Sequence, residues 1–244
     1  MTARMTASDF DWKPLALVPL LALVTLPLVG SPSTWLTLTV AGLAMGMIIF
    51  IIASGLTLVF GLMDVLNFGH GVFIALGAFV ATSVLGAMGD WTGSAELWRN
   101  LVAVLPAMLV AMAVAGALGL AFERFIVRPV YGQHLKQILI TMGGMIIGEE
   151  LIKVIWGPAQ IPLPLPEGMR GSLLVGDAAI VRYRLVAVAV GLVVFGVLAW
   201  TLSRTKVGLL IRAGVQDREM VESLGYRIRR LFVGVFVAGS ALAG

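Results

Sequence analysis

The chain has 244 residues, of which 59% are hydrophobic and only 12% are charged, whereas a soluble domain has about 25% charged residues. This composition excludes a soluble globular protein, because too few polar side chains are present to cover its surface. The net charge of +4 does not indicate nucleic-acid binding, since the basic residues lie in short segments between apolar runs. With no cysteine and two histidines, the chain is predicted to have no disulfide framework, no metal site and no cofactor.

Seven apolar segments follow one another along the chain. A bilayer core about 30 Å thick needs roughly 20 mainly apolar residues per helix, so the sequence predicts an all-α integral membrane protein, a polytopic bundle of transmembrane helices in one domain. The first segment is expected to be a retained helix, because no cleavage site of a signal peptide follows it. The last is too short to cross, and we expect C-terminal helices to be missing. The segments are residues 15–30, 35–61, 72–88, 101–122, 135–156, 185–202 and 231–244.

The second segment carries two glycines on one side of the expected helix. Gly42 and Gly46 are four residues apart, a spacing of small residues that favours close approach of membrane helices. We therefore predict that this side packs against another helix.

A polar break at residues 63–71 separates the second segment from the third. Asp64, Asn67 and His70 place polar groups near membrane depth, where they need partners, and Gly69 and Gly71 let the backbone bend or pack closely. Two interpretations stay open. Either Asp64 and Asn67 cap the next helix, or these five residues take part in a translocation path or its gating.

Three charged residues stand near the end of the fifth segment. Glu149 and Lys153 are four residues apart, which predicts an ion pair on one helix face, and Glu150 has no obvious local partner. These residues either pair and neutralise one another or contact a transported solute.

The loop at residues 203–230 contains a short predicted helix. Asp217 is a suitable N-cap, Glu219 lies in the first turn, and Gly225 is a suitable stop. Met220, Val221 and Leu224 are predicted to form one small apolar face. A helix of two turns is marginal alone, so it must dock, either on anionic lipid near Arg227, Arg229 and Arg230 or on a cytoplasmic partner.

The basic residues divide unevenly when they are sorted by alternating spans. By the positive-inside rule, the richer side is cytoplasmic, which places the N-terminus and residues 203–230 in the cytoplasm and residues 157–184 outside. The richer side holds Arg4, Lys13, Arg124, Arg128, Lys136, Arg204, Lys206, Arg212, Arg218, Arg227, Arg229 and Arg230, and the other side holds Arg99, Lys153, Arg170, Arg182 and Arg184.

Phosphate-binding and hydrolase motifs are absent from the sequence. It contains no Gly-Lys dipeptide, hence no P-loop, and neither H-E-x-x-H nor G-x-S-x-G. We predict that this chain is not an enzyme and does not itself hydrolyse ATP.

Several motifs together resemble one family. The stretch from Gly55 through Asn67-Phe68-Gly69-His70-Gly71 to Phe79 resembles the H-type permease of the Liv branched-chain amino-acid ABC importers, in which alanine is commoner than glycine at the position of Gly69. Arg128-Pro129, residues 216–219 and residues 236–244 also look like that family in order and spacing. The segment Asp217, Arg218, Glu219, Met220, Val221, Leu224 and Gly225 is similar to the Glu-Ala-Ala-x-x-x-Gly motif with which such permeases dock on their ATPases, with Met220 and Val221 in place of the alanines.

The resemblance implies a bacterial inner-membrane transport complex. Its other members would be a second homologous permease, two cytoplasmic ATPase subunits and an external substrate-binding protein, surrounded by membrane lipid, and Glu149 or Glu150 could then contact the substrate's ammonium group or the binding protein. Relatives with other cargo share the motif, so a permease for urea, amides or another small solute is an alternative. An ion-coupled secondary carrier is a further one, with Asp64, His70, Glu149 and Glu150 as relay groups.

Overall fold

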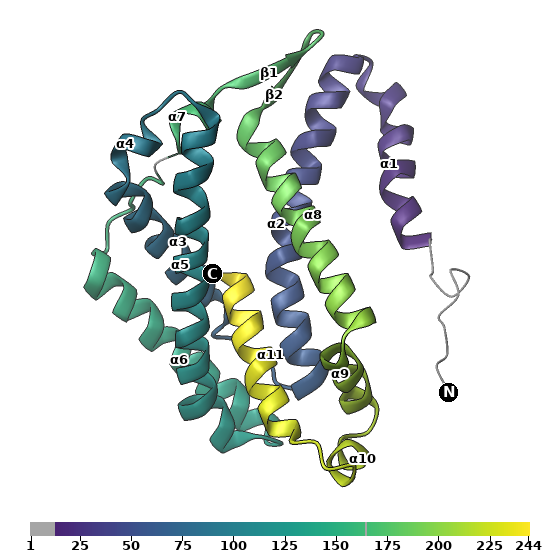
Figure 1. Cartoon of the computed structure of the whole chain (residues 1–244), viewed down its shortest axis with the longest axis vertical. Helices are drawn as coiled ribbons and strands as arrows, with labels where there is room; N and C mark the ends of the chain where they lie inside the picture. The colour runs from purple at the N-terminus through teal and green to yellow at the C-terminus, as the bar shows by residue number, and fades with distance from the viewer. Residues whose placement is uncertain (1–12, 164) are drawn as a thin grey trace.

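The computed structural model describes residues 13–163 and 165–244 as an elongated bundle of helices (Figure 1). All seven apolar segments predicted from the sequence form helices. The described elements are α1 (Lys13–Val29), α2 (Pro32–Met63), α3 (His70–Ala87), α4 (Gly89–Thr92), α5 (Leu97–Phe122), the π-helical turn η2 (Glu123–Val127), the 3-10 turn η3 (Arg128–Val130), α6 (His134–Trp156), α7 (Glu167–Arg170), β1 (Ser172–Val175), β2 (Ala178–Val181), α8 (Arg182–Arg204), α9 (Lys206–Gln216), α10 (Arg218–Ser223) and α11 (Ile228–Ala243).

Among the described residues, four helical segments are long and apolar enough to cross a membrane, namely α2, α3, the segment Leu97–Val130 and α8. Large apolar side chains such as Leu23, Val193 and Trp200 are more than half exposed on the outer faces of α1 and α8. Lipid can cover such faces, because lipid tails are as apolar as the side chains themselves. The predicted all-α membrane fold is thus confirmed, while the exact set of spans stays a prediction.

Helix α2 shows how the sequence sets the limits of an element. Ser31 accepts a hydrogen bond from the Thr34 amide at 3.4 Å and Pro32 occupies the first turn, both typical of a helix start. The helix continues for 32 residues, about 48 Å at 1.5 Å per residue. It ends at Asp64, whose φ of 54° is left-handed and whose amide donates to the Phe60 carbonyl.

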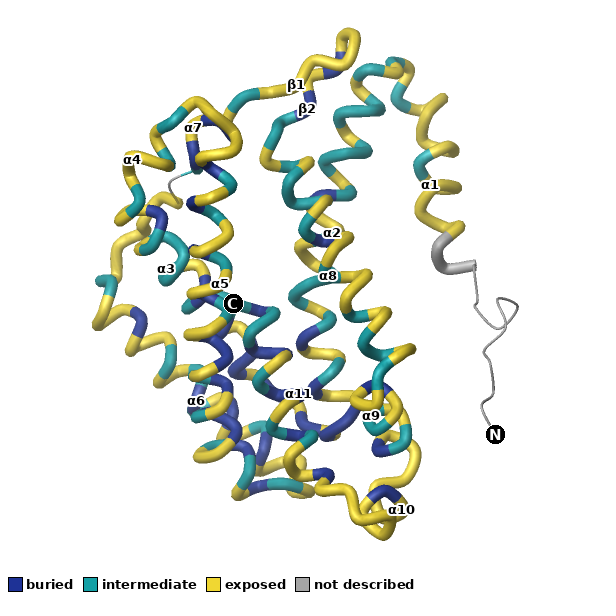
Figure 2. Tube along the Cα trace, viewed as in Figure 1, coloured by how far each residue is buried: buried dark blue, intermediate teal, exposed yellow. Residues whose placement is uncertain are grey.

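Helix α11 lies in the middle of the bundle, packed against α2, α3 and α5. The crossing with α2 is close at two glycines: a Cβ on Gly55 would lie 2.5 Å from the Gly239 carbonyl oxygen. Phe73, Phe122 and Phe236 meet beside it, with the Phe73 ring 5.6 Å from that of Phe122 and 6.1 Å from that of Phe236. Buried residues gather in this region, whereas most of the remaining trace is exposed (Figure 2).

The prediction that Gly42 and Gly46 pack against another helix is wrong for the described residues. A Cβ at either position would meet nothing within 4 Å. Both glycines line an open groove of about 720 Å³ between α1, α2 and α8. The close helix contact lies instead at Gly55, about two and a half turns beyond Gly46 along α2.

The loops divide between two ends of the bundle (Figure 1). One end, called here the α10 end, carries residues 64–69, η2, η3, α9 and α10. The other, called here the hairpin end, carries α4, α7 and the antiparallel pair β1–β2, in which Ser172 pairs with Val181. Residues 157–163, which contain Pro158 and Pro162, form no helix or strand, as their prolines predict.

Candidate functional site

Asp64 ends α2 and does not cap α3. Its side chain is 58% exposed, and its Oδ2 lies 3.6 Å from Nε2 of His134, which begins α6. The predicted capping role for Asp64 is therefore wrong, because five residues separate it from the first residue of α3 and those residues form a turn of their own.

Asn67 forms that turn. Its buried side-chain oxygen accepts a hydrogen bond from the Gly69 amide at 3.0 Å, and its carbonyl accepts one from the His70 amide at 3.2 Å. A bond from an Asn side chain to the amide two residues on is an Asx turn. The N-cap of α3 is Gly69, which provides no side-chain bond, so the predicted helix cap at Asn67 is also wrong.

His70 and Gly69 face the interior. The His70 ring is 6% exposed, with Nε2 3.2 Å from the Ile52 carbonyl oxygen of α2. A Cβ on Gly69 would lie 2.6 Å from the Phe122 ring, whereas a Cβ on Gly71 would meet nothing within 4 Å. Glycine at position 69 thus leaves room for an aromatic ring of α5, and Gly71 has no such constraint.

Helix α6 holds the same loop through Thr141, which the sequence analysis did not single out. Its hydroxyl is fully buried, bonds to the Gln137 carbonyl at 2.7 Å, and lies 3.4 Å from the Phe68 amide, which donates to it. Gln137 and Thr141 are four residues apart in an apolar segment. That spacing of polar residues on one helix face was the signal that could have identified them.

A buried carboxylate stands where α5 passes into η2. Glu123 is 1% exposed, and its Oε1 accepts a hydrogen bond of 2.5 Å from the Tyr131 hydroxyl. Burial, together with this carboxylate, raises the pKa of Tyr131 far above its ordinary value, so the hydroxyl keeps its proton and remains a donor. π-helical turns inside helices often mark functional sites. Sequence reasoning missed Glu123, although a charge at the end of an apolar run was visible.

Helix α10 has the caps that the sequence predicts. The Asp217 side chain accepts from the Met220 amide at 2.9 Å, and Gly225 has a φ of 85°. The single apolar face predicted for it is wrong. Val221 is 2% exposed and Met220 is 61% exposed, because neighbouring residues of a helix point about 100° apart. Leu224, which follows the last residue of α10, is 69% exposed.

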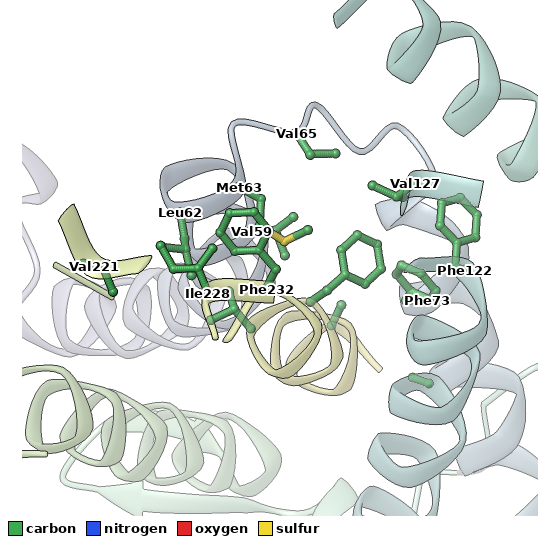
Figure 3. Close-up of a cluster of buried hydrophobic side chains, with 14 residues drawn as sticks. Val59, Leu62, Met63, Val65, Phe73, Phe122, Val127, Val221, Ile228 and Phe232 are labelled. Atoms are coloured by element: carbon green, nitrogen blue, oxygen red, sulfur yellow. The ribbon is translucent and has the colours of Figure 1, made fainter. Parts of the chain in front are cut away.

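The inner side of α10 belongs to the buried cluster drawn in Figure 3. Val221 lies beside Leu62 of α2 and beside Ile228 and Phe232 of α11. Met63 and Val65, which flank Asp64, belong to the same cluster. The end of α2, the loop at residues 64–69 and α10 are thereby one packed unit.

The charged residues of α6 lie apart from this unit. Lys153 Nζ is 2.6 Å from Glu150 Oε1, and both side chains are more than half exposed. The predicted pair with Glu149 is therefore wrong, and so is the view that Glu150 lacks a local partner. Glu150 is sixteen residues beyond His134, about 24 Å along the helix axis, so Asp64, His70, Glu149 and Glu150 form no continuous relay.

No group of three or more His, Cys, Asp or Glu residues that could hold a metal ion occurs within residues 13–163 and 165–244. The polar side chains that come together near residues 64–69 are the Asn67 amide, the Thr141 hydroxyl, the imidazoles of His70 and His134 and the carboxylate of Asp64. These side chains make a packed junction between α2, α3 and α6.

Comparison with known proteins identifies the family. The family described as the permease component of branched-chain amino acid transport systems matches residues 38–244. The chain is 31% identical over 216 residues to the high-affinity branched-chain amino acid transport system permease protein BraD of Pseudomonas aeruginosa, covering 84% of this chain and 66% of BraD. It is 28% identical to the corresponding protein LivH of Escherichia coli, over 83% of this chain and 66% of LivH. No solved structure gives a significant match. The chain belongs to the family of branched-chain amino acid transport permease components.

Proposed function

We propose that this chain is the transmembrane permease subunit of an ATP-driven importer for branched-chain amino acids in a bacterial inner membrane. The observation that carries the proposal is α10, a capped helix that is anchored inward by Val221 and presents Met220 and Leu224 outward. Exposed apolar side chains on a short surface helix can form the contact site for another protein. The partner proposed here is an ATPase subunit, because the chain has no P-loop of its own.

The remaining partners of this proposal are a second homologous permease, a second ATPase subunit and an external substrate-binding protein. ATP-driven closure of the ATPases would move α10 and re-orient the helices, giving alternating access. Cargo is proposed from the printed names of the relatives. Uptake assays with leucine, isoleucine and valine against urea and short amides test it, and uptake of urea alone would replace the amino acids as cargo.

The α10 end is proposed to face the cytoplasm together with the N-terminus. Sixteen basic residues are described, and their distribution supports this. Ten lie toward the α10 end, Lys13 begins α1, and five lie toward the hairpin end, namely Arg99, Lys153, Arg170, Arg182 and Arg184. Ser172 in the exposed strand β1 offers a test. In this cysteine-free chain, Ser172→Cys should react with an impermeant thiol reagent in intact cells, and reaction only after permeabilisation would reverse the orientation.

Docking of an ATPase on α10 is tested by paired charge reversals. Glu219→Lys changes the first position of the docking motif, and Glu222→Lys makes the same change of charge elsewhere on the exposed side of the helix. We expect Glu219→Lys to reduce co-purification of the ATPase and ATP-dependent uptake more than Glu222→Lys does. Gly225→Val should have a similar effect to Glu219→Lys, because a β-branched residue resists a φ of 85°.

Attachment to lipid alone predicts a different result. Both charge reversals would then strengthen binding to anionic membranes equally, by about 1 kcal/mol per basic residue. Wild-type uptake and wild-type recovery of the ATPase in both Glu219→Lys and Gly225→Val would refute docking at α10.

A further inference from the structure

The side chain of Arg218, the first residue of α10, contacts the end of α2. Its Nη2 donates a hydrogen bond of 3.0 Å to the carbonyl oxygen of Leu62, 156 residues away in sequence. Leu62 is the penultimate residue of α2, and the last carbonyls of a helix lack partners within the helix. A guanidinium at this place satisfies such a carbonyl and complements the negative end of the helix dipole.

A second contact holds the same side chain from α11. The guanidinium carbon lies 5.2 Å from the centroid of the Phe232 ring, and Phe232 is only 8% exposed. A planar guanidinium can stack on a ring and donate sideways at the same time, which an ammonium group does less well. Arg218 is therefore held in one place between two helices.

The contact lies next to the loop that carries the polar residues of the site. Asp64, two residues after Leu62, has the left-handed conformation that turns the chain out of α2. Val221, one turn after Arg218, packs in the same buried cluster as Leu62 and Val65. Arg218, which is itself exposed, and Val221, which is buried, thus both connect α10 to the end of α2.

We propose that Arg218 is a positioning residue that transmits movement of α10 to the end of α2 and hence to residues 64–69. This inference rests on the proposed function, in which an ATPase moves α10. Displacement of α10 would pull on the Leu62 carbonyl through the guanidinium. Residues 64–69 would shift with it. Asn67, which forms the turn in this loop, and His70, whose ring is hydrogen-bonded to α2, would shift as well.

The chain offers a matched control in Arg212. Its guanidinium also donates to a carbonyl near the end of a helix, that of Leu202 in α8, but it stands on α9. Arg212→Ala therefore removes the same kind of contact without cutting the connection between α10 and α2.

The test uses the complete transporter reconstituted in vesicles. In Arg218→Ala, uptake per ATP hydrolysed should fall about tenfold, the factor for losing one hydrogen bond to a charged group, whereas Arg212→Ala should keep the wild-type ratio. Arg218→Lys should recover part of the loss, because it keeps a charge and a donor. Melting temperatures and recovery of the ATPase show whether each variant folds and assembles.

A second readout follows the loop directly. Leu66 is 42% exposed, and a single Leu66→Cys should label at a rate that changes with ATP in the otherwise unchanged transporter and does not change in Arg218→Ala. An ATP response of equal size in both would refute the role of Arg218 while leaving the proposed function intact. If the ATPase does not co-purify with the unchanged chain, the proposed function fails and this inference fails with it.

Discussion

At the α10 end, side-chain hydrogen bonds join segments that are far apart in sequence, whereas at the hairpin end most charged side chains pair within one helical turn. Thr141 contacts Phe68 across 73 residues and Arg218 contacts Leu62 across 156. The three ion pairs toward the hairpin end, Glu96–Arg99, Glu150–Lys153 and Glu167–Arg170, each join residues three apart and are about half exposed. Exposed pairs contribute only about 0–1 kcal/mol to stability, so visible charges are a poor guide to the site.

Asn100 is the main exception at the hairpin end. It is fully buried and donates to the carbonyls of Trp91 and Ser94, both at 2.9 Å, while its own oxygen accepts from the Gly168 amide at 2.7 Å. It thereby ties α5 to α7 and to the turn before α5. Buried polar side chains therefore join elements at both ends. At the α10 end two of them, Asn67 and Thr141, bond to the same loop at residues 64–69.

The largest effect on stability is expected from substitution of Gly55 in α2, compared with the same substitution of Gly46. Gly55→Leu puts a side chain against the main-chain oxygen of Gly239, which cannot rotate away, and should lower the free energy of unfolding by about 3 kcal/mol. Gly46→Leu meets open space and should change it little. Denaturation of both purified variants in detergent measures the difference, and equal loss would mean that α2 and α11 do not cross at Gly55.

Substitutions of two buried asparagines are expected to affect stability and transport differently. Asn100→Ala leaves a buried amide and two carbonyls without partners and should cost about 2 kcal/mol. Asn67→Ala removes one local bond and should cost about 1 kcal/mol, yet reduce uptake more, because its turn belongs to the loop that we propose to move with α10. Unfolding and uptake are measured on the same preparations. The distinction between the two ends would collapse if uptake simply followed stability.

A smaller effect is expected at Thr141. Thr141→Val keeps the shape but removes the hydroxyl that accepts from the Phe68 amide, and should cost about 1 kcal/mol together with part of the uptake. Thr141→Ser, which retains the hydroxyl, should restore uptake. Failure of the serine variant to do so would show that the hydroxyl alone is not sufficient and that the methyl group is needed as well.

The smallest effect is expected for the pair on α6. Glu150→Gln should change the free energy of unfolding by less than about 0.5 kcal/mol, since Lys153 and Glu150 are exposed and screened by solvent. A double-mutant cycle with Lys153→Gln measures the pair itself. A coupling of several kcal/mol, or loss of uptake at wild-type stability, would move the functional site toward the hairpin end.

Local features were predictable from the sequence where a short rule applies. The apolar runs predict the helices, Asp217 and Gly225 predict the limits of α10, and Pro158 and Pro162 account for the absence of helix in residues 157–163. The hairpin β1–β2 was not predicted, although Gly176-Asp177 between two apolar runs is a hairpin signal, because strands of four residues are too short to show a clear alternating pattern. The motif around Asn67 and His70 identified the family without revealing what these side chains contact.

By itself the sequence determined the class of fold, the position of the helices, the capped form of α10 and membership of the family. Only the tertiary structure decided that Gly55 rather than Gly46 meets another helix, that Val221 turns inward while Met220 turns outward, and that Arg218 reaches Leu62. The physical reason is that lipid and protein interior are equally apolar, so a membrane helix carries no polar stripe to show which side packs inward. The partners of its few polar groups depend on how the helices assemble.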